Sequence, residues 1–192
     1  DRLDPPHSSG DSLSGGYIVK VDKLSGLSAN DFFRTNPLVS FNNARRYDFT
    51  YVYPKSEEIQ PLQKTYIKNF LSELETALNG TNFKDPGVGF RSYIDEVSFA
   101  EFQIIQELSN NVDGYRYSTF FYKQSDSDGG KLIAGPLWDF DLCYGNVDYS
   151  PVNLATNTWL YPNYGPNEGY PMHWWARLMQ DSDYQLLVKK RY

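Results

Sequence analysis

Two stretches of alternating residues predict β-strands in the first third of the chain. In "GGYIVKVDK", Tyr17, Val19 and Val21 alternate with Ile18 and Lys20, a pattern with the β-branched bias of strands. In "RYDFTYVYPK", four aromatic residues fall on one face of a second predicted strand, which Pro54 ends: Tyr47, Phe49, Tyr51 and Tyr53. One face of each strand is therefore expected to be buried.

Apolar residues at three-to-four spacing predict two main helices. The first is expected to open at Ser56, to tolerate Pro61 in its first turn and to stop at Asn79–Gly80. Its predicted buried stripe comprises Ile59, Leu62, Tyr66, Phe70, Leu74 and Leu78. The second is expected to start at Ser98, which forms a capping box with Glu101, and to end in "NNVDG". Its stripe comprises Phe99, Phe102, Ile105 and Leu108.

The second half of the chain predicts a hairpin, a long loop and two short helices. "YRYSTFFYK" and "KLIAGPLWDFD" predict strands joined by "QSDSDGG". Residues 144–170 are rich in Asn, Pro, Gly and Tyr and predict a long loop. "MHWWARLMQD" and "SDYQLLVKKRY" predict helices, the second of which stops without a cap, as if the chain had been cut there. These elements indicate an α+β class, with strands and hairpins packed on two main helices in a single domain over residues 1–192.

Composition narrows the classes of partner. The 192 residues carry a net charge of −6, and the one Lys/Arg-rich run is "KKRY" at the end, so a nucleic-acid partner is not expected. The single cysteine, Cys143, excludes an internal disulfide and a cysteine-based zinc site. No apolar run approaches the roughly 20 residues that a transmembrane helix needs.

The run "GPLWDFDLCYGN" places Asp139 and Asp141 among large apolar residues. If the strand extends this far, the two carboxylates lie on one face and repel each other unless a proton or a cation lies between them. A hard divalent cation such as Mg²⁺ prefers such oxygen ligands. The alternative is a structural pair that accepts hydrogen bonds from backbone amides at the end of a strand. Both interpretations stay open on the residues alone.

A second candidate acid, Asp113, follows the second helix in "SNNVDGYRYS". A carboxylate on such a loop can orient a hydroxyl group and accept its proton, although "VDG" is also ordinary turn chemistry. The order of helix, acid loop, hairpin and acid pair is the order that kinase-type phosphoryl transfer uses. This order favours a shared site for Asp113, Asp139 and Asp141.

Other features suit competing functions. Asp126 and Asp128 could bind Ca²⁺, but a solvated hairpin tip explains them better. A Cys143–His173 nucleophilic pair has no supporting motif, and no P-loop, G-x-G-x-x-G or G-x-S-x-G is present. "YPNYGPNEGYPMHWW" suits contact with a glycan, or else the edge of a core; Trp174 and Trp175 are expected in the core.

Several segments together resemble the spore coat protein H (CotH) kinase-like family. They occur in the order "GGYIVKVDK", "YVYPK", "FKDP", "SFAEFQIIQELSNNVDGYRYSTFFYK", "GGKLIAGPLWDFDLCYGN" and "WWARLMQD". The resemblance runs from about residue 15 to residue 190, and is most specific in N-x-D followed by W-D-F-D. It looks closest to secreted or surface-attached members of Bacteroides-type bacteria, which implies an extracytoplasmic protein.

The resemblance implies an atypical protein-kinase-like fold that uses ATP with Mg²⁺ or Mn²⁺ and phosphorylates Ser/Thr hydroxyls of surface or coat proteins. Carried over by motif, Asp113 is the catalytic acid with Asn111 beside it, and Asp139 and Asp141 are the metal-binding acids. Asn146 is a further supporting polar group. Lys20 and Lys123 are the candidates for cofactor binding.

This chain departs from the family pattern at three places. Many members carry a Glu in the strand after the G-x-Y, where this chain has Val21. The nucleotide-contacting lobe is expected upstream of "GGYIVKVDK", so the chain is expected to be mainly the C-terminal-lobe portion, truncated at both ends. Ser118 and Thr119 stand where a kinase catalytic loop carries a metal-binding Asn. These departures keep a second reading open, a non-catalytic surface or coat module that binds protein or glycan with the same fold.

Overall fold

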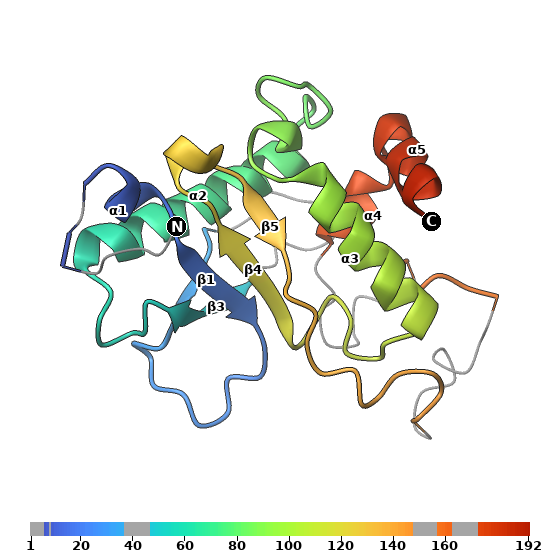
Figure 1. Ribbon diagram of the computed structural model, residues 1–192, viewed down its shortest axis with the longest axis horizontal. Coiled ribbons are helices and arrows are strands. Elements are labelled where there is room, and N and C mark those ends of the chain that lie inside the picture. Colours follow the sequence, from blue (N-terminus) through green and yellow to red (C-terminus); the bar gives the residue numbers. More distant parts are fainter. Residues whose placement is uncertain (1–5, 8, 37–46, 148–156, 163–172) are drawn as a thin grey trace.

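The computed structural model describes residues 6–7, 9–36, 47–147, 157–162 and 173–192. Its five strands form one antiparallel sheet in the order β2-β3-β1-β4-β5 (Figure 1). The strands are β1 (Tyr17–Val21), β2 (Phe32–Arg34), β3 (Asp48–Tyr53), β4 (Thr119–Lys123) and β5 (Leu132–Ala134). The helices are α1 (Asp11–Ser14), α2 (Pro61–Asn79), α3 (Glu96–Ser109), α4 (Trp174–Leu178) and α5 (Ser182–Arg191), with short 3-10 turns at Phe90–Ser92 and Asp126–Asp128.

The strands predicted at residues 17–21 and 47–53 are confirmed, and β1 joins two other strands in one sheet. Tyr17, Val19 and Val21 are buried, as the alternation predicts. β1 pairs with β3 on one side and with β4 on the other, where Val21 lies opposite Thr119. The β4–β5 hairpin also forms, with Phe121 opposite Ala134. The end of β1 and the start of β4 therefore lie side by side.

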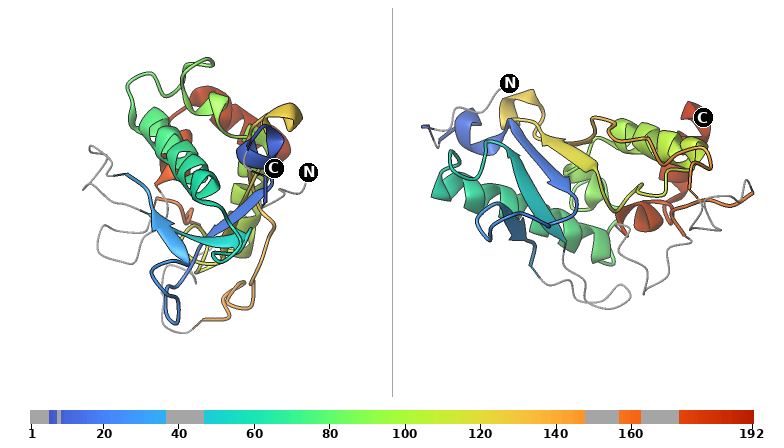
Figure 2. Two further views of the ribbon diagram at one scale, coloured as in Figure 1. Left: turned by 90° about the vertical axis from the view of Figure 1, so that its left-hand side faces the viewer. Right: turned by 90° about the horizontal axis from the view of Figure 1, so that it is seen from below.

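Helix α2 covers one face of the sheet (Figure 2). The ring of Tyr66 stacks on Tyr17 of β1, with 6.1 Å between ring centroids. The prediction that this helix opens at Ser56 is wrong, because Gln60 caps it in a reciprocal pair with Gln63 and Pro61 takes the first helical position. The Ser56 hydroxyl instead donates to the Asp31 carboxylate. The end at Asn79–Gly80 is confirmed.

The buried face of α2 also differs from the predicted stripe. Leu74 and Leu78 are buried as expected, but Leu62 is exposed and Tyr66 and Phe70 are only partly buried. The helix instead buries Gln63, Ile67, Leu71, Ser72 and Glu75 with the two leucines. Polar residues at buried positions weaken the apolar period from which a helix face is predicted.

Helix α3 begins two residues before the predicted start. Asp95 is its N-cap, and its carboxylate accepts a hydrogen bond from the Ser98 backbone amide. Phe99 and Phe102 are buried, whereas the outer part of the predicted stripe is exposed at Ile105 and Leu108. The helix ends at Ser109, and its C-cap Asn110 has a left-handed φ of 51°, so the predicted stop is confirmed.

The core lies between the sheet and the helices α2, α3 and α4. Trp174 and Trp175 are fully buried, as the sequence predicts. Trp174 packs against Phe49 of β3 and Phe121 of β4, and Trp175 stacks on Phe99 of α3. α3 packs with α5 beyond the β5 edge of the sheet (Figure 1). Within the described part of the chain, none of the helices combines the length and apolar composition that a bilayer crossing needs.

The strand that was predicted to reach the acid pair ends early. β5 stops at Ala134, because Gly135 has a φ of +128° and Pro136 has no amide hydrogen to continue the ladder. Residues 135–147 therefore form an irregular segment that runs from the sheet toward the end of α3 (Figure 1).

Candidate active site

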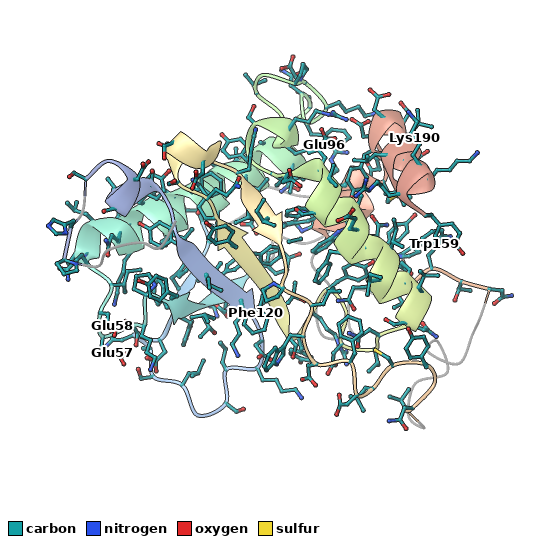
Figure 3. The ribbon with its side chains drawn as sticks, in the orientation of Figure 1. Glu57, Glu58, Glu96, Phe120, Trp159 and Lys190 are labelled. Carbon is teal, nitrogen blue, oxygen red and sulfur yellow. The ribbon has the colours of Figure 1, made fainter. Side chains whose placement is uncertain are left out.

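Two irregular segments meet where β1 ends and β4 begins. Residues 110–118 connect α3 to β4, and residues 135–146 follow β5. The backbone amide of Tyr144 donates to the Ser109 carbonyl at 2.7 Å, which fixes the second segment against the end of α3. Phe120, which Figure 3 labels, marks the adjoining part of β4.

The central contact joins Ser118 to Asp139. The Ser118 hydroxyl donates to the Asp139 carboxylate at 3.1 Å. Both residues have left-handed backbones, with φ of 48° and 63°, an uncommon conformation for residues other than glycine that is frequent at functional sites. Asp139 is exposed. Its carboxylate is therefore held by a partner on one side and open to a ligand on the other.

Asp22 extends this contact to β1. Its carboxylate accepts hydrogen bonds from the Lys20 ammonium group and from the Lys23 backbone amide, both at 2.8 Å. Burial raises the pKa of Asp22, but these bonds and one from the Ser118 backbone amide outweigh burial and hold the pKa below its usual value. Lys20, Asp22, Ser118 and Asp139 thus form a continuous polar chain.

Asp113 lies in the turn that follows α3. Its carboxylate pairs with Arg116 at 3.1 Å, and its backbone amide donates to the Asn111 side-chain oxygen at 3.2 Å. Asn111 is buried, so in this arrangement it shapes the turn that presents Asp113. Gly114 is tightly packed: a β-carbon there would lie 2.9 Å from the Asn111 carbonyl oxygen and 2.8 Å from the Gln106 side chain.

The three predicted acids all lie close enough to the Cys143 thiol to affect its pKa. Burial raises the pKa of Cys143, and the negative charges of Asp141, Asp113 and Asp139 raise it further, against a hydrogen bond with Ser109 that lowers it. All three carboxylates therefore lie within electrostatic reach of one buried sulfur atom.

The structure corrects the picture of the acid pair itself. Asp139 and Asp141 are not two neighbours on one face of a strand, because β5 ends at Ala134. Both residues are exposed, as are Leu137 and Trp138 beside them, so the acids do not lie within an apolar core.

The three acids Asp113, Asp139 and Asp141 suit a cation whose other ligands are phosphate oxygens and water. No group of three or more His, Cys, Asp or Glu side chains in the described part of the chain is arranged to hold a metal ion by itself. Mg²⁺ commonly binds one or two carboxylates and completes its shell with phosphate oxygens and water. Asp139, with the Ser118 hydroxyl beside it, fits that pattern.

The two candidate lysines lie in different places. Lys20 lies opposite Phe120, near the acids, and pairs with Asp22. Lys123 lies at the other end of β4, four residues and about 13 Å from Thr119. It is 1% exposed, and its ammonium group donates to the carbonyls of Ser14 and Gln124. The structure therefore brings Lys20 to the acids and does not bring Lys123 there.

An exposed aromatic surface borders Asp139 on the open face of the sheet. Trp138 is 61% exposed and packs against Phe120, with 6.0 Å between ring centroids. The Lys20 ammonium group lies 5.5 Å from the centroid of the Phe120 ring. Sequence reasoning missed both aromatic residues and Asp22. The one signal was the alternation in β4, which places Phe120 opposite in direction to the buried Phe121.

The remaining candidates separate from this site. The tip at residues 125–130 forms a 3-10 turn at the far end of the hairpin, and Asp126 is 70% exposed there. His173 is hydrogen-bonded to the Tyr47 hydroxyl, and burial lowers its pKa to about 4, whereas Cys143 lies beside Ser109. Most of the aromatic loop predicted for glycans, residues 163–172, lies outside the described residues.

One family comparison matches this chain. A family model described as CotH kinase protein matches residues 8–192, a range that includes both acid segments and the whole sheet. No curated protein and no solved structure matches the chain.

Proposed function

Because the chain belongs to the CotH kinase protein family, we propose that it transfers the γ-phosphate of ATP to Ser/Thr hydroxyls of protein acceptors. Membership of the family implies a kinase-like fold and suggests a kinase that uses ATP. The choice of Ser/Thr, of surface or coat proteins as acceptors, and of an extracytoplasmic location rests on the motif resemblance alone.

One observation carries the proposal, the hydrogen bond between Ser118 and Asp139. Ser118 lies five residues after Asp113 in the chain. Kinase catalytic loops have a metal-binding Asn at that spacing from the catalytic Asp, next to the metal-binding acid that follows the hairpin. Ser118 stands at the spacing of that Asn. It contacts Asp139, which is the proposed counterpart of the metal-binding acid. The order of residues along the chain and their contacts therefore agree.

In this proposal Asp113 orients the acceptor hydroxyl and accepts its proton. The hydroxyl oxygen forms a bond to the γ-phosphorus while the bond between that phosphorus and the bridging oxygen breaks, so ADP leaves with the electron pair. Arg116 pairs with Asp113 at 3.1 Å and holds its carboxylate in position. Asn111 is a positioning residue, because its side chain holds the turn through the Asp113 amide.

Asp139, the Ser118 hydroxyl and Asp141 would hold Mg²⁺ or Mn²⁺ together with the phosphates. Such an ion supplies neutralisation of the charge that develops on the phosphate oxygens. Lys20 stands at the same end of the sheet, with Asp22 fixing its ammonium group. The exposed ring of Trp138, which packs against the partly buried Phe120, offers an apolar face for a nucleotide base. We therefore assign cofactor contact to Lys20 and not to Lys123.

The test is phosphate transfer from γ-labelled ATP to a protein mixture and to the chain itself, with Mg²⁺ and with Mn²⁺. It uses the full-length protein beside its Asp139→Asn and Asp113→Asn variants, and Asp128→Asn at the hairpin tip as a matched exposed control. We expect transfer by wild type and by the control, and a loss of at least about a hundredfold in the other two. Equal transfer by wild type and both site variants would overturn the proposal. No transfer by any of them would favour the non-catalytic binding module.

A further inference from the structure

A cavity of about 980 Å³ lies between α3 and α5, and none of the predicted acids Asp113, Asp139 and Asp141 lines it. Ile104 and Leu108 of α3 and Val188 of α5 form its aliphatic side. Residues 144–145 and 157–159 also line it, and Figure 3 labels Trp159 beside α3. This volume is at the upper end of the range for small-molecule sites.

Three exposed aromatic side chains from three separate segments line this cavity. Tyr144 is 81% exposed, Trp159 is 45% exposed and Tyr192 is 77% exposed. Large apolar rings that gather at one exposed hollow mark a surface that meets a ligand, whereas single exposed rings need no explanation. Such rings offer flat faces on which a ligand with apolar C–H groups can stack.

The polar part of the lining is almost entirely neutral. It comprises the amide side chains of Asn110, Asn157 and Gln185 and the hydroxyl of Thr158. A purely apolar ligand would strip water from these groups without replacing their hydrogen bonds. An anionic ligand would meet a single cationic side chain, Lys189, among the residues of the lining that the structure describes. The lining therefore suits a neutral ligand with many hydroxyl groups and apolar faces.

Glu107 holds the segment that carries Trp159 in place. Its carboxylate accepts hydrogen bonds from the backbone amides of Leu160 and Tyr161 and, at 2.7 Å, from the Tyr115 hydroxyl. These bonds fasten residues 160–161 to α3, and Trp159 packs edge-on against Tyr161. Glu107, the one acid among the lining residues that the structure describes, is thus occupied by the protein itself. Its bonds also hold the segment that follows Trp159, which lowers the entropic cost of binding.

We infer that this cavity binds a neutral oligosaccharide, with its sugar rings stacked on Trp159 and Tyr144 and its hydroxyl groups hydrogen-bonded to the surrounding amides. Binding at this site requires neither ATP nor a metal ion. Such binding would bring a glycan or a glycosylated partner next to the acid site. The backbone amide of Tyr144, which lines the cavity, donates a hydrogen bond to the carbonyl of Ser109, directly before the 110–118 segment.

The test measures binding of named neutral oligosaccharides to the full-length protein by calorimetry, without nucleotide. The panel contains cello-, xylo-, manno- and chito-oligosaccharides. We expect at least one series to bind, and Trp159→Ala to weaken that binding by about tenfold or more, the effect of losing one aromatic stacking contact. Leu62→Ala, which truncates an exposed apolar side chain of α2 outside the cavity, is the control and leaves binding unchanged.

Tyr192→Ala provides a second test that does not depend on the fold around residue 159, since this side chain lies at the end of α5 and is largely exposed. We expect it to weaken binding severalfold. The inference is overturned if no series binds, or if both Trp159→Ala and Tyr192→Ala bind as tightly as wild type. The inference is also overturned if the cavity binds an unglycosylated peptide and none of the oligosaccharides. Phosphate transfer by the same samples reports on the proposed kinase activity separately.

Discussion

The Ser118 hydroxyl donates a hydrogen bond of 3.1 Å to the Asp139 carboxylate, across twenty-one positions of the chain. This contact joins the segment that carries Asp113 to the segment that carries the W-D-F-D run. Both residues of the contact have left-handed backbones, with φ of 48° and 63°.

Ser118→Gly tests whether this hydroxyl supports phosphate transfer. Glycine accepts a φ of 48° without strain, so the variant removes the oxygen and keeps the backbone. We expect transfer from ATP to fall by about 10- to 100-fold, which corresponds to a lost hydrogen bond to a charged group. The Mg²⁺ concentration for half-maximal rate is expected to rise.

Ser118→Asn is the companion variant, since asparagine tolerates a left-handed backbone and restores a side-chain oxygen. It should recover part of the rate and of the Mg²⁺ dependence. A glycine variant as active as wild type would show that the Ser118–Asp139 bond has only a structural role.

Lys20 and Lys123 are expected to fail in different assays. Lys20→Met removes a partly exposed ion pair with Asp22. The free energy of unfolding should therefore change by less than about 1 kcal/mol, while the rate of phosphate transfer falls. Lys123→Ala leaves a cavity and two carbonyls without their donor, so it should destabilise the fold by about 2–4 kcal/mol.

Chemical denaturation and ATP titrations measure these two effects independently. Below its melting temperature, the Lys123→Ala protein should bind ATP as wild type does. A Lys123→Ala variant that is stable but unable to bind ATP would restore this residue as a nucleotide ligand and remove the assignment to Lys20.

Local patterns predicted the elements of the fold better than their assembly. The strand at residues 17–21 was predictable because burial of one face imposes alternation on the residues themselves. Nothing in that alternation indicates that β1 pairs with both β3 and β4, because pairing partners depend on contacts between distant segments. Helix starts were misplaced where two caps compete within three residues, as Asp95 and Ser98 do.

The candidate site was predictable in its acids and not in its surroundings. Asp113 and Asp139 stand out because the order of elements along the chain is itself informative. Asp22 and Trp138 were missed because their importance lies in contacts across strands. The surroundings of Lys123 were not predictable for the same reason: its ammonium group donates to the carbonyl of Ser14, 109 positions away in the sequence, which no local pattern reveals.

Gly114→Ala tests how tightly the Asp113 turn is fixed. The new methyl group would lie 2.9 Å from the Asn111 carbonyl oxygen, a contact that the backbone must relieve by moving. We expect a loss of about 1–3 kcal/mol in stability and a fall in the rate of phosphate transfer at saturating ATP, with little change in ATP affinity.

The matched control is Gly87→Ala, where the nearest atom is a side-chain oxygen at 3.4 Å. It should leave both stability and the transfer rate unchanged. If Gly114→Ala lowers stability but transfers phosphate at the wild-type rate, the position of Asp113 does not limit the reaction.

Glu75 makes the stability of the fold depend on pH. Burial within α2 raises the pKa of this carboxyl to about 8, against smaller opposing effects of Thr35 and Trp174, whereas the unfolded chain titrates near 4.5. Between these two values the folded protein holds a proton that the unfolded chain releases. Stability contributed by Glu75 is therefore greatest below pH 4.5, falls as the pH rises toward 8 and is constant above it.

Glu75→Gln removes this dependence, because the amide is neutral at every pH. We expect the variant to be more stable than wild type at pH 7, by up to about 3 kcal/mol, and to match it near pH 4.5. Urea denaturation from pH 4.5 to 9 measures the difference, and Glu73→Gln, an exposed position on the same helix, should follow the wild-type curve. Parallel curves for Glu75→Gln and wild type would show that Glu75 is charged in the folded protein, with a cation or water satisfying it in the core.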